Sequence, residues 1–146
     1  MPRKIPGKLP KDMQIIVNKL KKSRNKEDCL RKAYDILSKK NRGHRLKTYT
    51  CLPELFVCNV NKLWKKKGFM HCTNINYLLR ILLVKSGFFK EKDIKSKWTL
   101  VWYFSPHQYL KIRLNKNKFV YVDIWAKPYG IKFGEYAHGL NIPIFS

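Results

Sequence analysis

The first 87 residues carry apolar side chains at helical spacing, which predicts a series of helices. Apolar positions recur every three or four residues in segments 12–20, 26–40 and 53–64. Asn41-Arg42-Gly43 is expected to end the second of these helices. Residues 1–10 contain three prolines and one glycine among basic residues, so we expect an irregular basic arm there.

The segment from Thr73 to Ser86 has the strongest helical pattern in the chain. Five apolar residues fall on one face, and two more widen that face until it nearly surrounds the helix: Ile75, Leu78, Leu79, Leu82, Leu83, Ile81 and Val84. Gly87 supplies a stop signal at the C-terminal end. Because a helix that is apolar on nearly every side is buried, we expect this segment to be the central helix of the fold.

After Lys97 the pattern changes to the alternation that is typical of strands. Segments 98–104, 107–114 and 119–125 are predicted strands, and residues 115–118 are the turn of a hairpin. The tail from Ala126 onward is rich in glycine and proline. We expect it to wrap around the sheet and to form one short strand near Ile131.

Helices followed by an antiparallel sheet predict an α+β fold. The chain has 146 residues, of which 45% are hydrophobic, and this is enough for one core but too little for two ordinary domains. We therefore expect a single domain from residue 11 to residue 146.

The charge of the chain is strongly positive and allows two interpretations. The formal net charge is +23, from 32 basic and 9 acidic residues. Such an excess favours contact with phosphate backbones or other polyanions. Most of the basic residues are scattered lysines, whereas arginine is the side chain that forks onto phosphate, so a solvated lysine coat explains the charge equally well. We expect weak, nonspecific contact with nucleic acid at most.

The apolar runs and the cysteines indicate a cytoplasmic protein without a membrane segment or cofactor. Ile15-Ile16-Val17 is too short for a signal peptide, and Asn76 and Arg80 interrupt the longest apolar run. Four cysteines, at positions 29, 51, 58 and 72, form no CxxC pair, so we interpret them as reduced thiols. Cys51 and Cys58 follow His44 at a spacing that fits no common zinc pattern, so no metal is expected.

Three residues stand where a thiol-dependent enzyme needs them. Cys72 directly precedes the central helix, His107 opens one predicted strand, and Asp123 lies in the next. The positive end of a helix dipole favours a thiolate, an imidazole beside it can form an ion pair, and a carboxylate can orient the ring. The backbone N–H of Cys72 is a candidate donor to an oxyanion. The sequence leaves the second donor open.

The hairpin register decides whether this triad can form. A two-residue turn, Lys116-Asn117, would put Asp123 on the opposite face of the sheet from His107, because side chains alternate along a strand. A three-residue loop over 115–117, or an equivalent bulge, shifts the register by one residue. Asp123 then lies opposite Tyr109 and on the same face as His107. We predict this second register.

The order of these elements resembles the transglutaminase-like superfamily, which has a papain-like fold. The likeness covers residues 26–126 and rests on Gly68-Phe-Met-His-Cys72, on Ser105-Pro-His107 and on Phe119-Val-Tyr-Val-Asp123. The resemblance implies that Cys72 is the nucleophile, His107 the general base and acid, and Asp123 the orienting carboxylate. It also implies a peptide or protein amide as substrate and a thioester intermediate, resolved by water or by a primary amine.

Other interpretations of the same residues stay open. The scaffold can serve as a basic nucleic-acid-binding module without turnover. The thiol can also carry out a related reaction, such as acetylation of an amine from an acyl-thioester donor, which would need a cleft for that cofactor. His71 can be a second base, a zinc ligand beside Cys72, or a solvated residue flanking the helix. Trp64 and Trp98 are expected in the core or in the wall of a cleft.

Overall fold

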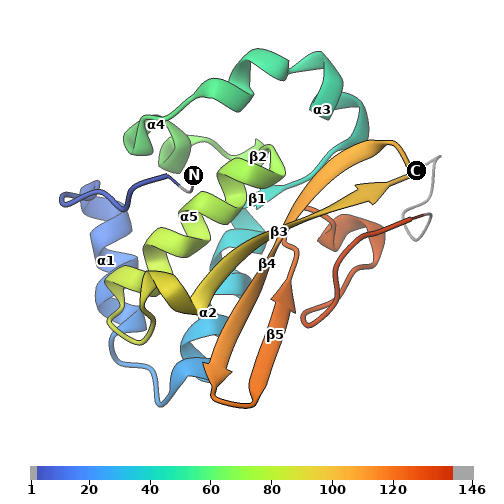
Figure 1. The fold of residues 1–146 in the computed structure, drawn as a ribbon. Helices are drawn as coiled ribbons and strands as arrows, with labels where there is room; N and C mark the ends of the chain where they lie inside the picture. The colour runs from blue at the N-terminus through green and yellow to red at the C-terminus, as the bar shows by residue number, and fades with distance from the viewer. Residues whose placement is uncertain (1–2, 140–146) are drawn as a thin grey trace.

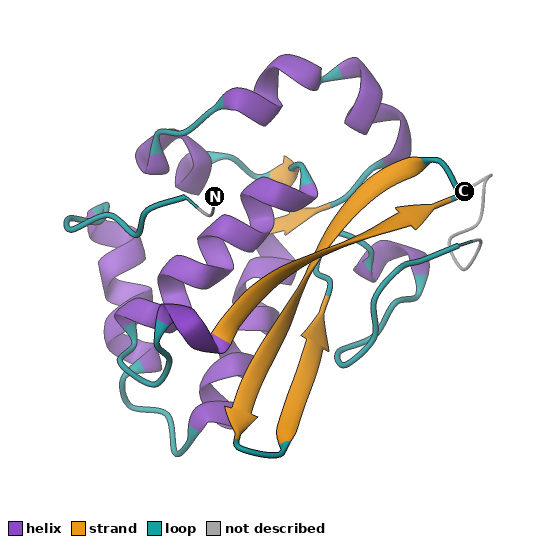
Figure 2. Ribbon diagram, viewed as in Figure 1, coloured by secondary structure: helices purple, strands orange, loops and turns teal. Residues whose placement is uncertain are grey.

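The computed structural model describes residues 3–139, which fold as a layer of helices packed on a three-stranded sheet (Figures 1 and 2). Five α-helices are present in this range: α1 (Lys11–Leu20), α2 (Lys26–Lys40), α3 (Arg45–Thr50), α4 (Val60–Lys65) and α5 (Cys72–Lys85). The strands and short 3-10 helices are β1 (Asn41–Arg42), η1 (Leu52–Phe56), β2 (Gly68–Phe69), η2 (Glu91–Asp93), β3 (Ile94–Val101), β4 (Ser105–Asn115), β5 (Lys118–Val122) and η3 (Lys127–Tyr129). The predicted α+β class is confirmed.

Helix α5 is the centre of the core, as its pattern predicts. Ten of its residues, Asn74 through Leu83, are buried, and the helix packs against α2 and β4. Gly87 follows it with φ +86°, a left-handed conformation that glycine adopts without steric cost. Within the described residues, no helix is both long and apolar enough to cross a lipid bilayer.

The predicted helix over 53–64 is wrong. The segment forms the short helix η1, an extended stretch at residues 57–59, and then α4. Asn59 begins α4 as its N-cap, because its side chain accepts a hydrogen bond from the amide of Lys62 at 3.1 Å. A capping side chain in mid-segment therefore overrides the continuous apolar spacing.

The main sheet is antiparallel in the order β3-β4-β5, and its second hairpin has the predicted register. Asn115 pairs with Lys118 across a two-residue turn, but a bulge between Arg113 and Asn115 then shifts the ladder by one residue. Arg113 consequently pairs with Phe119, and Leu110 pairs with Val122. A bulge thus supplies the odd offset in place of a three-residue loop.

The two ends of the described chain lie against the core. In the arm, the backbone carbonyls of Arg3 and Lys4 accept hydrogen bonds from the side chains of Arg80 and Tyr77 on α5. The strand expected near Ile131 is absent from the described tail, because Pro128 lies in the turn η3 and Ile131 instead anchors the chain in the core. The part of the predicted domain and tail that covers residues 140–146 lies outside the described residues.

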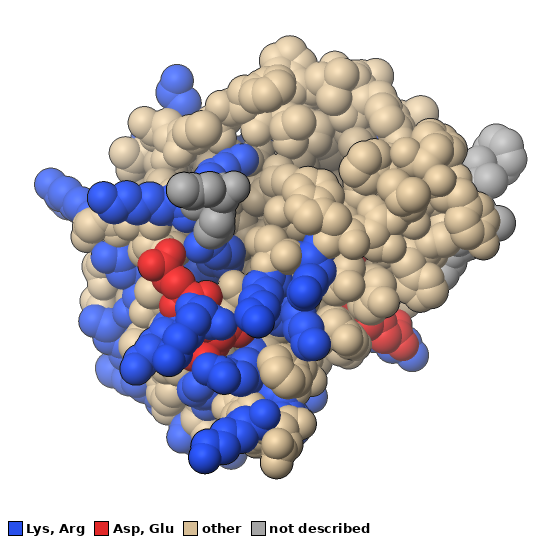
Figure 3. Space-filling model, viewed as in Figure 1, with Lys and Arg blue, Asp and Glu red and all other residues tan. Residues whose placement is uncertain are grey.

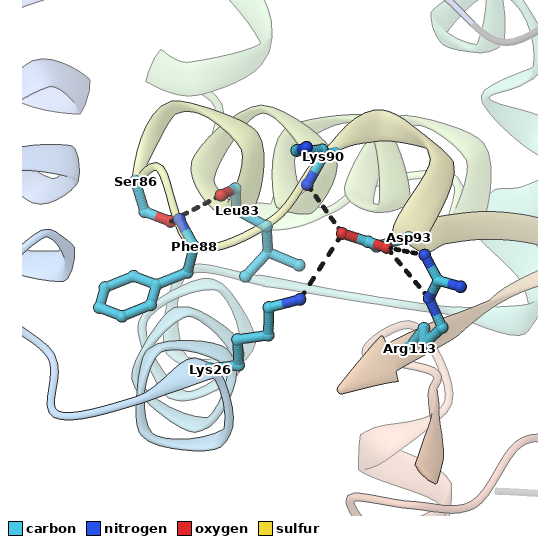
Figure 4. Close-up of polar contacts among 7 residues, drawn as sticks. All are labelled: Lys26, Leu83, Ser86, Phe88, Lys90, Asp93 and Arg113. Atoms are coloured by element: carbon cyan, nitrogen blue, oxygen red, sulfur yellow. Dashed lines mark hydrogen bonds and ion pairs between the residues drawn. The ribbon is translucent and has the colours of Figure 1, made fainter. Parts of the chain in front are cut away.

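Asp93, which follows the C-terminal end of α5 in the chain, joins α2 to β4 through Lys26 and Arg113 (Figure 4). Its carboxylate accepts two hydrogen bonds from Arg113, at 2.7 and 3.1 Å, and one from the amide of Lys90 at 3.0 Å. The ammonium group of Lys26 lies 3.7 Å away. Burial by itself raises the pKa of Asp93, but these hydrogen bonds and cations outweigh it and hold the pKa below its ordinary value.

Candidate active site

Cys72 is the first residue of α5, and the backbone around it forms a regular helix start. The amides of Asn74 and Ile75 both donate to the carbonyl oxygen of His71, each at 3.0 Å. At such a start the first backbone N–H groups have no acceptor within the helix and carry the positive end of its dipole. The partly exposed Cys72 side chain therefore lies where negative charge is stabilised.

His107 and Asp123 form a buried pair. His107 lies in β4, Asp123 directly follows β5, and the distance from His107 Nε2 to Asp123 Oδ2 is 2.7 Å. Only 3% of His107 and 2% of Asp123 are exposed. The bulged register brings the two side chains to one face of the sheet, so the predicted contact between them is confirmed.

Backbone amides hold the Asp123 carboxylate in one orientation. The amide of Ala126 donates to Oδ1 at 3.3 Å, and the amide of Ala137 donates to Oδ2 at 2.9 Å. With His107, three donors surround this carboxylate. Ala137 belongs to the tail, so the tail completes the environment of Asp123.

The other ring nitrogen of His107 is left for Cys72. Because Nε2 contacts Asp123, Nδ1 is the ring nitrogen that remains for the Cys72 thiol, which lines the same crevice as His107. Burial by itself lowers the pKa of His107, but the hydrogen bonds and negative charges of Asp123 and Cys72 outweigh it and raise the pKa above its ordinary value of 6.5. The structure thus brings together all three residues that the sequence singled out, in the order thiol, imidazole, carboxylate.

Trp125 covers the His107 ring, and Gly43 makes room for it. The ring centroids of Trp125 and His107 are 5.1 Å apart, and Trp125 is buried. The amide of Gly43 donates to the carbonyl oxygen of Trp125 at 3.0 Å, and a Cβ atom at position 43 would lie 2.3 Å from the indole. Gly43 therefore makes room for Trp125. It lies beyond the end of α2, whose last residue is Lys40. Sequence reasoning missed Trp125, although its place two residues after Asp123 was the available signal.

A narrow crevice of about 20 Å³ gives access to Cys72 and His107. This volume holds about one water molecule. Thr48 of α3 lies on one wall, and Ser105 at the start of β4 lies on the other. The hydroxyl of Tyr49 donates to the Ser105 hydroxyl at 2.7 Å, so α3 and β4 are joined beside the crevice.

The β3–β4 turn at the rim of this crevice carries two aromatic residues in a strained conformation. Trp102 and Tyr103 have φ angles of 51° and 61°, in the left-handed region that usually holds Asn and Gly in such a turn. Tyr103 and the following Phe104 are each 70% exposed. The turn therefore places Trp102 in the wall of the crevice at a cost in backbone energy.

Comparisons with known proteins give this geometry no counterpart. No family model, no curated protein and no solved structure matches the chain. The likeness to the transglutaminase-like superfamily accordingly depends on the order and spacing of Cys72, His107 and Asp123.

His71 has a structural position that the sequence did not predict. It is 4% exposed, so it is not a solvated residue, and its Nε2 atom lies 2.9 Å from the carbonyl oxygen of Cys51. This contact ties the start of α5 to the end of α3. Within residues 3–139 no group of three His, Cys, Asp or Glu side chains could hold a metal ion, and His44 caps α3 by accepting from the amide of Lys47.

The remaining cysteines differ from Cys72 in their surroundings. All four cysteines are free thiols. Cys29 is buried and its thiol lies 3.4 Å from the Ser86 hydroxyl, and burial raises its pKa. Cys58 is exposed and Cys51 is partly exposed. The most exposed thiol, Cys58, is therefore not the one that lines the crevice with His107. The other cysteines can serve as internal controls when the reactivity of Cys72 is measured.

Basic side chains avoid much of the face that surrounds the crevice. In Figure 3 lysine and arginine gather over α1, α2 and the far ends of the strands, whereas the surface over α3, η1 and the β3–β4 turn is mostly uncharged. Exposed Leu46, Leu52, Phe56 and Leu100 contribute to the segments on that face. On this face the basic side chains thus gather away from the surface over α3, η1 and the β3–β4 turn.

Proposed function

We propose that the chain is a cysteine-dependent acyl-transfer enzyme of transglutaminase-like type, with a papain-like arrangement of its core and an amide of a peptide or protein as substrate. The single observation that supports this most strongly is the buried His107, held at 2.7 Å by Asp123 and lining the same narrow crevice as Cys72. A structural histidine needs no thiol partner at a helix start. An activated thiol needs both contacts.

The reaction follows from the roles of the three side chains. The Cys72 thiolate attacks the carbonyl carbon, and the electron pair of the C=O bond moves onto oxygen. When the intermediate collapses, the C–N bond breaks and the His107 imidazolium gives its proton to the leaving amine. The product is a thioester on Cys72. Water or a primary amine then attacks this thioester, His107 takes up its proton, and the Cys72 thiolate leaves.

Two donors beside the crevice can stabilise the oxyanion. The backbone N–H of Cys72 has no acceptor within α5. The Ser105 hydroxyl accepts from Tyr49, so its own proton is available to donate into the crevice that it lines. Because the crevice holds about one water molecule, an amide substrate requires α3 and the β3–β4 turn to separate.

Iodoacetamide labelling across pH, followed by mapping of the modified cysteine, tests this proposal. We expect Cys72 to react fastest at pH 6–7, because the proposed triad would pair its thiolate with the His107 imidazolium. Cys58 serves as the control, since it is more exposed but has no imidazole partner among the described residues. Cys58→Ser should leave the fast reaction unchanged, and Cys72→Ala should remove it while preserving the fold. Faster labelling of Cys58 at every pH would contradict the proposal.

A further inference from the structure

A pocket of about 310 Å³ adjoins the candidate active site along α5. Thr73, the residue after Cys72, is at one end, and Tyr77 and Arg80 continue along the same face of the helix. Phe56 of η1 and Trp98 of β3 also line it, from segments that flank α5 in Figure 1. These aromatic walls are 77% and 58% exposed, so the pocket is open to a ligand.

Two polar atoms at this pocket are buried without a hydrogen-bond partner among the described residues. They are Nη1 of Arg3 and the hydroxyl oxygen of Thr73, and both residues line the pocket. A buried donor without a partner costs free energy, so native structures keep few of them. A ligand with a polar group at each end of the pocket would satisfy the guanidinium at one end and the hydroxyl at the other.

The far end of the pocket is positively charged. Arg80 is 6% exposed, and its guanidinium donates to the carbonyl oxygen of Arg3 at 3.1 Å. The Arg3 guanidinium lies over the ring of Tyr77, 5.0 Å from its centroid. Glu91 offsets part of this charge, because it lies 3.4 Å from Arg80, but it is itself 58% exposed. The pocket therefore combines aromatic walls with two guanidinium groups.

We infer that this pocket is a substrate subsite that binds a carboxylate and an adjoining apolar group. Thr73 and Arg80 are seven residues apart, which corresponds to about 10 Å along a helix. The carboxylate would therefore lie about three extended residues from the amide that Cys72 attacks. An acidic side chain or a free C-terminus supplies the same group. This inference rests on the proposed function, because it assigns a role in substrate binding to a pocket beside Cys72.

Direct binding to the Cys72→Ala variant tests the subsite without turnover. The probes are hexapeptides blocked at both ends that contain Phe and a single Glu moved along the chain, each with a Gln counterpart. A second set keeps Gln and has a free C-terminal carboxylate. Calorimetry should show one Glu position that binds about tenfold more tightly than its Gln counterpart. If the free C-terminus alone gives this gain, the carboxylate comes from the chain end.

Matched variants separate the pocket from the general positive charge. Arg3→Gln should abolish the preference for Glu, and Arg3→Lys should restore part of it. Lys8→Gln removes an exposed charge from the same arm but outside the pocket, so the preference should remain. Equal affinity for Glu and Gln peptides, or an equal loss in the Arg3→Gln and Lys8→Gln variants, would overturn the subsite. Amide turnover by the wild-type chain without a Glu preference would leave the proposed function standing and overturn the subsite. Peptide binding with a Glu preference but without turnover would support the subsite and contradict the proposed function.

Discussion

Replacing Asp123 by asparagine should disable Cys72 while the fold persists. The amide oxygen of asparagine can still accept from the backbone N–H of Ala126 or Ala137, but its NH₂ group cannot accept from His107. If that NH₂ group donates to Nε2, the ring carries its proton on Nδ1. This tautomer cannot take a proton from Cys72.

The size of the effect follows from the contact that is lost. A hydrogen bond to a charged group contributes about 1.5–3 kcal/mol, and 1.4 kcal/mol corresponds to a tenfold change in rate. We therefore expect the reactivity of Cys72 at pH 7 to fall about 10- to 100-fold. The free energy of unfolding should fall by about 1–3 kcal/mol, because buried donors around Asp123 lose an acceptor.

The pH dependence of stability should change with it. The pKa of His107 is raised in the folded state, so the contribution of the pair is fully present below pH 6.5 and is lost as the pH rises toward the raised pKa. Asp123→Asn should remove this loss of stability above pH 6.5.

Labelling rates at Cys72 and urea unfolding at several pH values measure both effects. Asp35→Asn is the matched control, because Asp35 is an exposed aspartate on α2. If Asp123→Asn lowers stability but leaves the labelling rate of Cys72 unchanged, the carboxylate has a structural role alone and the reasoning is refuted.

Three further substitutions test features of the fold. Asp93→Ala should lower the free energy of unfolding in urea by about 2–4 kcal/mol, since it leaves Arg113 without its carboxylate. The difference in stability from wild type should shrink as the pH falls below the ordinary aspartate pKa of 3.8. A difference that stays constant with pH would be inconsistent with an ionised Asp93. Tyr103→Gly should raise the free energy of unfolding by about 1 kcal/mol, because glycine relieves the strain of a left-handed φ of 61°. A lower free energy of unfolding would mean that the tyrosine ring stabilises the turn. Gly43→Ala should displace the indole of Trp125, lower stability by about 1–3 kcal/mol and slow Cys72 labelling; unchanged tryptophan fluorescence would argue against the close contact.

The periodic segments could be predicted from sequence because their apolar patterns are long and end at clear signals. The 26–40 helix has the predicted bounds, and α5 begins one residue before the predicted Thr73. The contact between His107 and Asp123 was also predictable, because the alternation of side chains allows only one register in which they meet. These features depend on local rules.

The features that escaped prediction depend on contacts between distant segments. Gly43 resembles a helix stop until the indole of Trp125 is seen against it. His71 is polar and adjoins a helix, yet its burial is set by the carbonyl of Cys51. The amide of Ala137 joins the environment of Asp123 from a tail that has no periodic pattern. No local signal encodes such packing.

The order β3-β4-β5 gives the sheet two outer edges, and this bears on how the chain behaves when concentrated. Part of the β5 edge is covered, because the amide of Gly134 donates to the carbonyl oxygen of Tyr121 at 3.1 Å. Among the described residues, the outer edge of β3 is covered only at its end, where the amide of Gly139 donates to the carbonyl oxygen of Leu100 at 2.9 Å. Along the rest of its described length β3 pairs with β4, and it exposes Lys95 and Lys97. A second copy that added to this edge would bring lysines of both chains together, at a cost in repulsion. The lysines on β3 thus oppose strand-by-strand polymerisation, and that protection weakens as added salt screens them.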